Sequence, residues 1–100
     1  LIALATPEES TFFHELCHVV DHKLKGGLKQ GQDPLQEITA ELAAQALCRL
    51  VGKDGAKYLG NSYRYIEKYA QDLKLSPYNA VLRVLTEVDA ILHYLLVPEN

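Results

Sequence analysis

The chain has 100 residues, 48% of them apolar, and a formal net charge of −3. This length and apolar content are enough for one small domain with a modest core. The negative net charge argues against a surface that binds duplex nucleic acid. The sequence contains no run of about 18 uncharged apolar residues and no basic-then-apolar leader, so we expect neither a membrane-spanning helix nor a signal peptide.

The first predicted elements are a short strand and a long helix. Residues 1–5 are apolar and are compatible with a short strand at the edge of a sheet. Thr6 and Pro7 then give a helix start, an N-cap followed by a first-turn proline, and Glu9 completes a capping box. The helix is predicted to continue to about Lys25, before a glycine pair. The chain contains no methionine and begins at a leucine, so we interpret it as a piece of a longer protein.

The first predicted helix carries the motif His-Glu-x-x-His at residues 14–18. Residues four apart lie on one face of a helix, so His14 and His18 can bind one ion, and Glu15 lies beside that ion, where a general base belongs. The alternative is that these are polar residues on a solvated face.

The rest of this helix favours the metal site over the solvated face. Its polar sector contains mostly imidazole and carboxylate groups, with Asp21 and His22 beside the motif, rather than the Lys, Glu and Ser of a usual solvated face. The other residues form a wide apolar arc: Phe12, Phe13, Leu16, Cys17, Val19, Val20 and Leu24.

Asp33 and Gln36 repeat the helix start signal, and a second helix is predicted to run from there to about Val51 and to end at Gly52. It is rich in alanine and apolar almost all round, which is typical of a buried helix. It also contains Cys48, which we expect, like Cys17 in the first helix, to be a free buried thiol, as fits a reducing cytoplasm.

Two acids of the second helix, Glu37 and Glu41, lie one turn apart. If they were buried without partners they would cost several kcal/mol, so we expect another group to neutralise them. The alternative is that they are partly solvated at the helix N-terminus and stabilised by the helix dipole.

The C-terminal half is predicted to contain a short helical turn and two helices. The turn covers residues 53–59, and the third helix begins with Asn61 or Ser62 as its cap and ends near Leu75. The fourth helix begins at Ser76-Pro77 and ends at Pro98. The predicted core residues of these two helices are Tyr65, Ile66, Tyr69, Leu73, Val81, Leu82, Leu85, Val88, Leu92 and Leu95.

Two histidines do not complete a zinc site, which needs a third protein ligand. His22 lies about 12 Å along the helix axis from His14, too far to share an ion, and we interpret it as a loop-facing residue or as one that supports a ligand. Glu37 fits better, because the glycine-containing loop lets the second helix fold back against the first. Glu41 would then accept a hydrogen bond from a ligand histidine, although the two acids could exchange these roles.

Together these motifs resemble the metallopeptidase domain of ArdC-type antirestriction proteins, which is related to the ImmA/IrrE metallopeptidases. The resemblance rests on residues 13–18, His22 and residues 37–48, and more weakly on Asn61, Tyr65 and the fourth helix. The order of the two acids is also similar to that of gluzincins, in which the first acid binds zinc. One departure is Ser62, which stands where many relatives carry histidine.

The resemblance implies a mainly α, four-helix zincin-like fold of the gluzincin type over residues 1–100, and a cytoplasmic zinc metallopeptidase. Zn²⁺ would be held by His14, His18 and Glu37, with Glu15 as the base for the attacking water. Tyr65 would be the oxyanion donor, although a tyrosine at helical spacing is also compatible with a simple core position.

The family is carried by plasmids, phages and integrated elements, and joins this domain to an N-terminal domain that binds single-stranded DNA. The partner of the present chain would therefore be a protein or peptide substrate, and single-stranded DNA would be bound only through that missing domain. Two alternatives are a catalytically silent, zinc-stabilised interaction domain of a multi-domain DNA-invasion protein, and a regulatory protease that cleaves a repressor.

Overall fold

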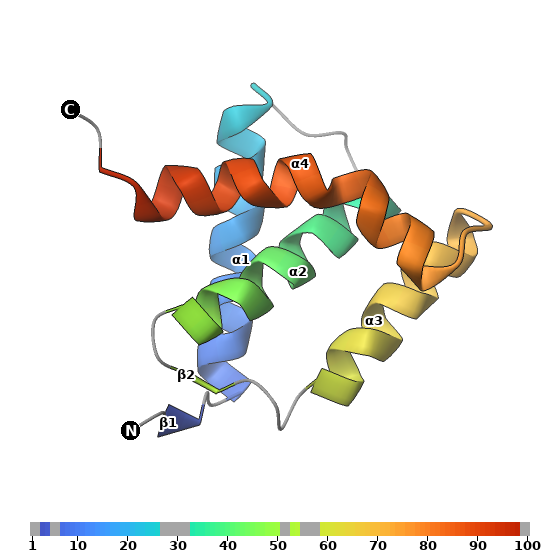
Figure 1. Ribbon diagram of the computed structural model, residues 1–100, viewed down its shortest axis with the longest axis horizontal. Coiled ribbons are helices and arrows are strands. Elements are labelled where there is room, and N and C mark those ends of the chain that lie inside the picture. The colour runs from blue at the N-terminus through green and yellow to red at the C-terminus, as the bar shows by residue number, and fades with distance from the viewer. Residues whose placement is uncertain (1–2, 5–6, 27–32, 51–52, 55–58, 99–100) are drawn as a thin grey trace.

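The computed structural model of the chain describes residues 3–4, 7–26, 33–50, 53–54 and 59–98. Four helices make up most of these residues, and two very short strands and a few turn and cap residues make up the rest (Figure 1). In chain order the elements are β1 Ala3–Leu4, α1 Pro7–Leu24, α2 Pro34–Leu50, β2 Lys53–Asp54, α3 Leu59–Asp72 and α4 Pro77–Leu96. The predicted mainly α architecture of four helices is confirmed at this level.

Helix α2 lies at the centre of the fold and contacts each of the other three helices (Figure 1). Eight of its side chains are buried, among them Ala40, Ala43 and Ala44, whose small size lets neighbouring helices approach closely. This confirms the prediction of a buried second helix. The Cα radius of gyration is 13.2 Å, close to the value of about 13 Å for a compact domain of this length.

Side-chain caps mark the beginnings of two helices where the sequence predicted them. At the start of α2, the backbone N–H of Leu35 donates to Asp33 Oδ1 at 3.0 Å. At the start of α4, Ser76 has an extended backbone and its hydroxyl oxygen accepts from the N–H of Asn79 at 3.2 Å. Each cap satisfies a backbone donor that has no partner inside its helix. The predicted cap of α1, Thr6, lies outside the described residues.

The segment between α2 and α3 differs from the prediction. Lys53 and Asp54 form a strand parallel to β1, with Lys53 opposite Ala3 and Asp54 opposite Leu4, instead of the start of a helical turn. The partner strand is some fifty positions away in the sequence, so local propensity could not reveal the pairing. A strand does exist at Ala3–Leu4, within the predicted residues 1–5.

Helix α3 is shifted towards the N-terminus relative to the prediction. It begins at Leu59, so Asn61 and Ser62 lie inside the helix rather than capping it. It ends at Asp72, before Lys74, which adopts a left-handed conformation with φ of 58°. This conformation reverses the chain ahead of Ser76 without a glycine.

The core lies between the facing sides of the four helices, and the prediction of which α4 residues face it is correct in part. Leu82 and Leu85 were predicted as core residues but are each 49% exposed. Val84 and Ile91 are buried in their place, at 2% and 0% exposed. The remaining predicted residues of α3 and α4 are either buried or packed against the core: Tyr65, Ile66, Tyr69, Leu73, Val81, Val88, Leu92 and Leu95.

The apolar face of α1 is narrower than predicted. Cys17 and Val20 are buried, whereas Phe12 and Val19 are 62% and 64% exposed. Asp21, predicted to belong to the polar sector, is only 2% exposed. Its carboxylate pairs with the ammonium group of Lys25 one turn later, with Oδ1 and Nζ 3.3 Å apart. The nearby cation explains how an acid is accommodated there.

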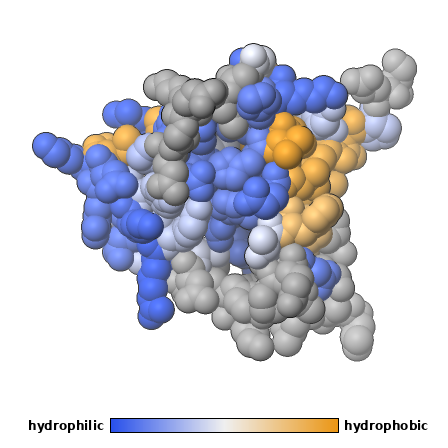
Figure 2. Space-filling model, turned by 180° about the vertical axis from the view of Figure 1, so that it is seen from behind, coloured by the Kyte–Doolittle hydropathy of each residue, from blue (hydrophilic) through white to orange (hydrophobic). Residues whose placement is uncertain are grey.

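The surface contains both hydrophilic and apolar areas. Seen from behind, hydrophilic residues cover the middle of the face and apolar residues gather towards one side (Figure 2). Among the described residues, no helix is both long and apolar enough to span a membrane.

Candidate metal centre

The candidate site forms where α1 and α2 pack in opposite directions. His14 and His18 project from α1 towards α2, and His14 meets Glu41 while His18, one turn later, meets the earlier Glu37. These four side chains are between 13% and 20% exposed. The antiparallel arrangement therefore places both acids of α2 beside the histidines of the motif.

Three of these residues point their donor atoms at one another. His18 Nε2 lies 2.9 Å from Glu37 Oε2, and His14 Nε2 lies 3.6 Å from Glu37 Oε1. Ligand atoms of His14, His18 and Glu37 all lie within 4.8 Å of one another, so this group could hold a metal ion.

These separations fit a zinc ion. Nitrogen and oxygen ligands bind zinc at about 2.0–2.2 Å, so two ligands of a tetrahedral site lie about 3.4 Å apart. The distances of 2.9 and 3.6 Å from Glu37 to the two histidines lie on either side of that value. Two imidazoles and one carboxylate are also a donor set used by catalytic zinc sites, which leave the fourth position open.

Glu41 lies on the other side of the His14 ring and has a different part in the site. Its Oε1 is 2.8 Å from His14 Nδ1. A carboxylate only accepts hydrogen bonds, so Nδ1 carries the proton in this contact. Whenever His14 is neutral, its lone pair is therefore on Nε2, the nitrogen that faces Glu37. The geometry therefore gives the two acids different roles. Glu37 belongs to the group that could hold a metal, and Glu41 orients His14.

The charges of the site shift the pKa values of both members of this contact. Burial lowers the pKa of His14, but the hydrogen bond to Glu41 and the negative charges of Glu41, Glu37 and Glu15 outweigh it, so the pKa is raised. Burial raises the pKa of Glu41, but hydrogen bonds from His14 and Ser62 and the charge of His14 reverse this, so it is lowered. In the metal-free site the pair is therefore stabilised as an imidazolium and a carboxylate.

Tyr65 brings α3 into the site. Its hydroxyl donates a short hydrogen bond to Glu37 Oε1 and lies 3.5 Å from His14 Nε2. Its ring packs edge-on against the His14 ring, with centroids 5.4 Å apart. Burial and the nearby Glu37 carboxylate raise the pKa of Tyr65, so the phenol stays protonated and acts as a donor. The residue thus packs partly against the core and also directs its hydroxyl into the site.

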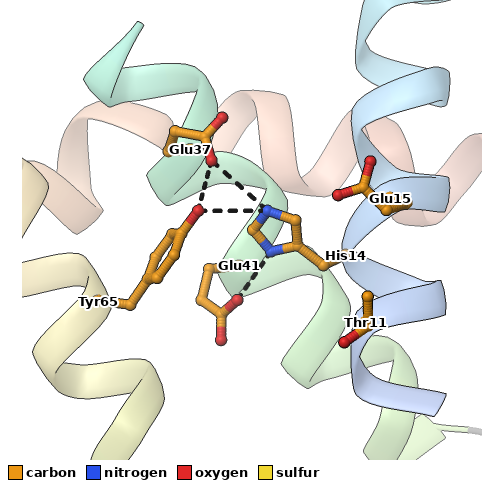
Figure 3. A pocket seen from close by; sticks show the side chains of 6 residues that line it. All are labelled: Thr11, His14, Glu15, Glu37, Glu41 and Tyr65. Carbon is orange, nitrogen blue, oxygen red and sulfur yellow. Dashed lines mark hydrogen bonds and ion pairs between the residues drawn. The ribbon is translucent and has the colours of Figure 1, made fainter. Parts of the chain in front are cut away.

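An open cavity of about 320 Å³ adjoins the site (Figure 3). The exposed side chain of Glu15 extends from α1 towards this space, which His14, Glu37, Glu41 and Tyr65 also line. His22 is exposed in the last turn of α1 and does not belong to the group that could hold a metal.

Three residues of the site were missed by the sequence reasoning. Thr11 lines the cavity one turn before His14 on α1. Ser62 and Gln45 extend the contacts of Glu41, because the Ser62 hydroxyl donates to Glu41 Oε2 and accepts from Gln45 Nε2. The four-residue spacing from Glu41 to Gln45 could have indicated one of them. No local pattern distinguishes Ser62 from an ordinary helix-start serine.

Comparisons of the chain with protein-family models, with curated proteins and with solved structures found no match.

Proposed function

We propose that this chain is the core of a zinc-dependent metallopeptidase with a zincin-like, gluzincin-type fold. The observation that carries the proposal is the convergence of His14, His18 and Glu37 from two helices at the edge of an open cavity. A metal-free role in packing would not require three potential ligands to direct their donor atoms at one another.

The side chains around the cavity have the chemistry for peptide hydrolysis. Zinc bound by His14, His18 and Glu37 would supply a Lewis acid that makes a water molecule more acidic and polarises the scissile carbonyl. The Glu15 carboxylate accepts a proton from the attacking water and passes it to the leaving amine. The Tyr65 hydroxyl, kept protonated by its raised pKa, donates to the carbonyl oxygen as negative charge develops there.

We further propose that the protein belongs to the ArdC-like group and acts on a specific protein of a host or mobile element. The support is the joint pattern of residues 13–18 and 37–48, whose histidines and acids meet in the site. A cytoplasmic location is proposed from Cys17 and Cys48, which are free and buried. A regulatory protease acting on a repressor would use the same residues, and a cleavage assay on purified repressors separates the two substrates.

The test compares Glu15→Gln with His18→Ala. Glu15→Gln keeps the ligands and removes the base, so zinc content should be unchanged while peptide cleavage falls by about 10²- to 10⁴-fold. His18→Ala removes a ligand and should lose both zinc binding and peptide cleavage. Zinc is measured by elemental analysis of purified protein and cleavage with a peptide library. Undiminished cleavage by Glu15→Gln would exclude Glu15 as the base.

A second candidate function is a zinc-stabilised interaction domain without catalysis. The observation that favours it is the Tyr65 hydroxyl, which donates to Glu37 and lies 3.5 Å from His14 Nε2, so it already contacts two of the three potential ligands. This function predicts zinc in the wild-type protein and no cleavage of any peptide.

If the protein is the peptidase proposed first, Tyr65→Phe removes the hydroxyl that donates to the carbonyl oxygen. This variant should keep zinc and slow cleavage by about 10²- to 10³-fold.

A further inference from the structure

We infer that Ser62 and Gln45 are positioning residues, which fix the orientation and tautomer of His14 by holding Glu41. Ser62 lies on α3 and is only 4% exposed. Its Oγ is 2.5 Å from Glu41 Oε2 and 2.8 Å from Gln45 Nε2. The part of this inference that concerns metal affinity rests on the proposed function, whereas the part that concerns the His14 ring does not.

The chemistry of the partners determines the direction of each hydrogen bond in the series that runs from Gln45 through Ser62 and Glu41 to His14. The amide nitrogen of Gln45 can only donate, so Ser62 Oγ accepts from it. The carboxylate of Glu41 can only accept, so the Ser62 hydroxyl proton points at Glu41 Oε2. Glu41 Oε1 remains to accept from His14 Nδ1–H. The proton of neutral His14 is therefore placed on Nδ1, and the lone pair on Nε2.

The chain of hydrogen bonds also connects the three helices that build the site. His14 belongs to α1, Glu41 and Gln45 to α2, and Ser62 to α3. Glu41 and Gln45 lie one turn apart on the same face of α2, so the Ser62 hydroxyl contacts both at once. Without this hydroxyl the Glu41 carboxylate loses a fixed donor and can rotate about its side-chain torsions. Rotation of Glu41 in turn frees the His14 ring.

Loss of the Ser62 hydroxyl should therefore weaken metal binding without removing a ligand. Partners that orient a ligand typically change metal affinity by about 10- to 100-fold when removed. Ser62 acts one step further out, through Glu41, so we expect Ser62→Ala to weaken zinc binding by about 10-fold. Gln45→Met keeps the length of the side chain but loses the donor, and should have a smaller effect in the same direction. Ser62→Thr retains the hydroxyl and should restore most of the affinity.

Thr39→Val is the matched control. Thr39 is on α2 and is 1% exposed, and its hydroxyl donates to the backbone carbonyl of Leu35 at 2.7 Å. It lies about 200° round the helix from Glu37, on the far side from the histidines. Thr39→Val and Ser62→Ala each remove one buried hydroxyl group, but only Ser62→Ala interrupts the contacts of Glu41. A general loss of stability would affect both variants alike.

The experiment has two readouts. In metal-free protein, ¹⁵N NMR at a pH where the imidazole is neutral should show wild-type His14 protonated at Nδ1 alone, and a mixture of tautomers in Ser62→Ala and Gln45→Met. With zinc, competition against a chelator of known affinity should give the ordering wild type, then Ser62→Thr, Gln45→Met and Ser62→Ala, with Thr39→Val equal to wild type.

The two readouts keep this inference separate from the proposed function. Wild-type zinc affinity in Ser62→Ala together with an unchanged His14 tautomer would overturn the inference and leave the metal site standing. Failure of the wild-type protein to bind zinc would overturn the proposed function, and the NMR readout would still decide the role of Ser62. If Ser62→Ala does not fold, Gln45→Met takes its place, and a single unchanged His14 tautomer in that variant would contradict the inference.

Discussion

At the scale of single residues, the pair of His14 and Glu41 makes the stability of the metal-free protein depend on pH. The pKa of His14 is raised above its ordinary 6.5, so its contribution is complete below that value and is lost as the pH rises through the folded pKa. The pKa of Glu41 is lowered from 4.5, so its contribution is complete above that value and is lost as the pH falls through the folded pKa. Both contributions are fully present between pH 4.5 and 6.5.

Urea denaturation of the metal-free protein checks this window. The difference in free energy of unfolding between wild type and Glu41→Gln should be largest between pH 4.5 and 6.5. It should shrink at higher pH, where His14 loses its proton, and at lower pH, where Glu41 gains one. Thr39→Val, whose buried hydroxyl does not titrate, should differ from wild type by the same amount throughout. A difference for Glu41→Gln that does not vary with pH would show that the pair carries no charge interaction.

At the scale of the helices, we expect the buried face of α4 to stabilise the fold more than its exposed face. Ile91 is fully buried, and Ile91→Ala should cost about 2–5 kcal/mol through lost burial and the cavity that it leaves. Leu85 is 49% exposed on the same helix, so Leu85→Ala should cost less than about 1 kcal/mol. Denaturant unfolding of both variants measures the difference. Equal losses would mean that Leu85 is covered in solution.

The helices were predictable where the signal was local. Asp33 and Ser76 begin their helices because a side-chain oxygen reaches a backbone N–H two or three residues ahead, and that pattern can be read from the sequence. The buried side of α4 was predictable only in part, because the helix is apolar on several sides and packing against α2 decides which side is covered. The strand at Lys53–Asp54 was missed because its partner is distant in the sequence.

In the candidate site too, features with a local sequence signal were predictable and features set by helix packing were not. His14 and His18 belong to one short motif, and the glycine-containing loop after α1 allowed Glu37 and Glu41 to be placed opposite them. Which acid meets which ring nitrogen depends on the register of α1 against α2, and only the structure shows it. Ser62 was interpreted as a helix cap, and its part in the site follows from the position of α3 rather than from any local pattern.

At the scale of the whole molecule, the site connects α1, α2 and α3 through polar side-chain contacts. Zinc bound to the folded chain alone would stabilise it by about 2.7 kcal/mol at a free concentration 100 times the Kd. For a domain of this length that corresponds to a rise in Tm of about 10–20 °C. Calorimetry with zinc and with a chelator measures the shift. His18→Ala should show no shift, and a wild-type Tm that does not depend on zinc would contradict a metal between α1 and α2.

The central position of α2 limits how this protein can evolve. The helix supplies both acids of the site and contacts every other helix, so it serves the site and the packing of the fold at once. A larger side chain on its alanine-rich surface would push neighbouring helices apart, and a one-residue deletion just after Glu41 would turn both carboxylates about 100° relative to the buried residues that follow. Sequence drift is therefore expected on the outer surfaces of α3 and α4, with α2 the slowest segment to change.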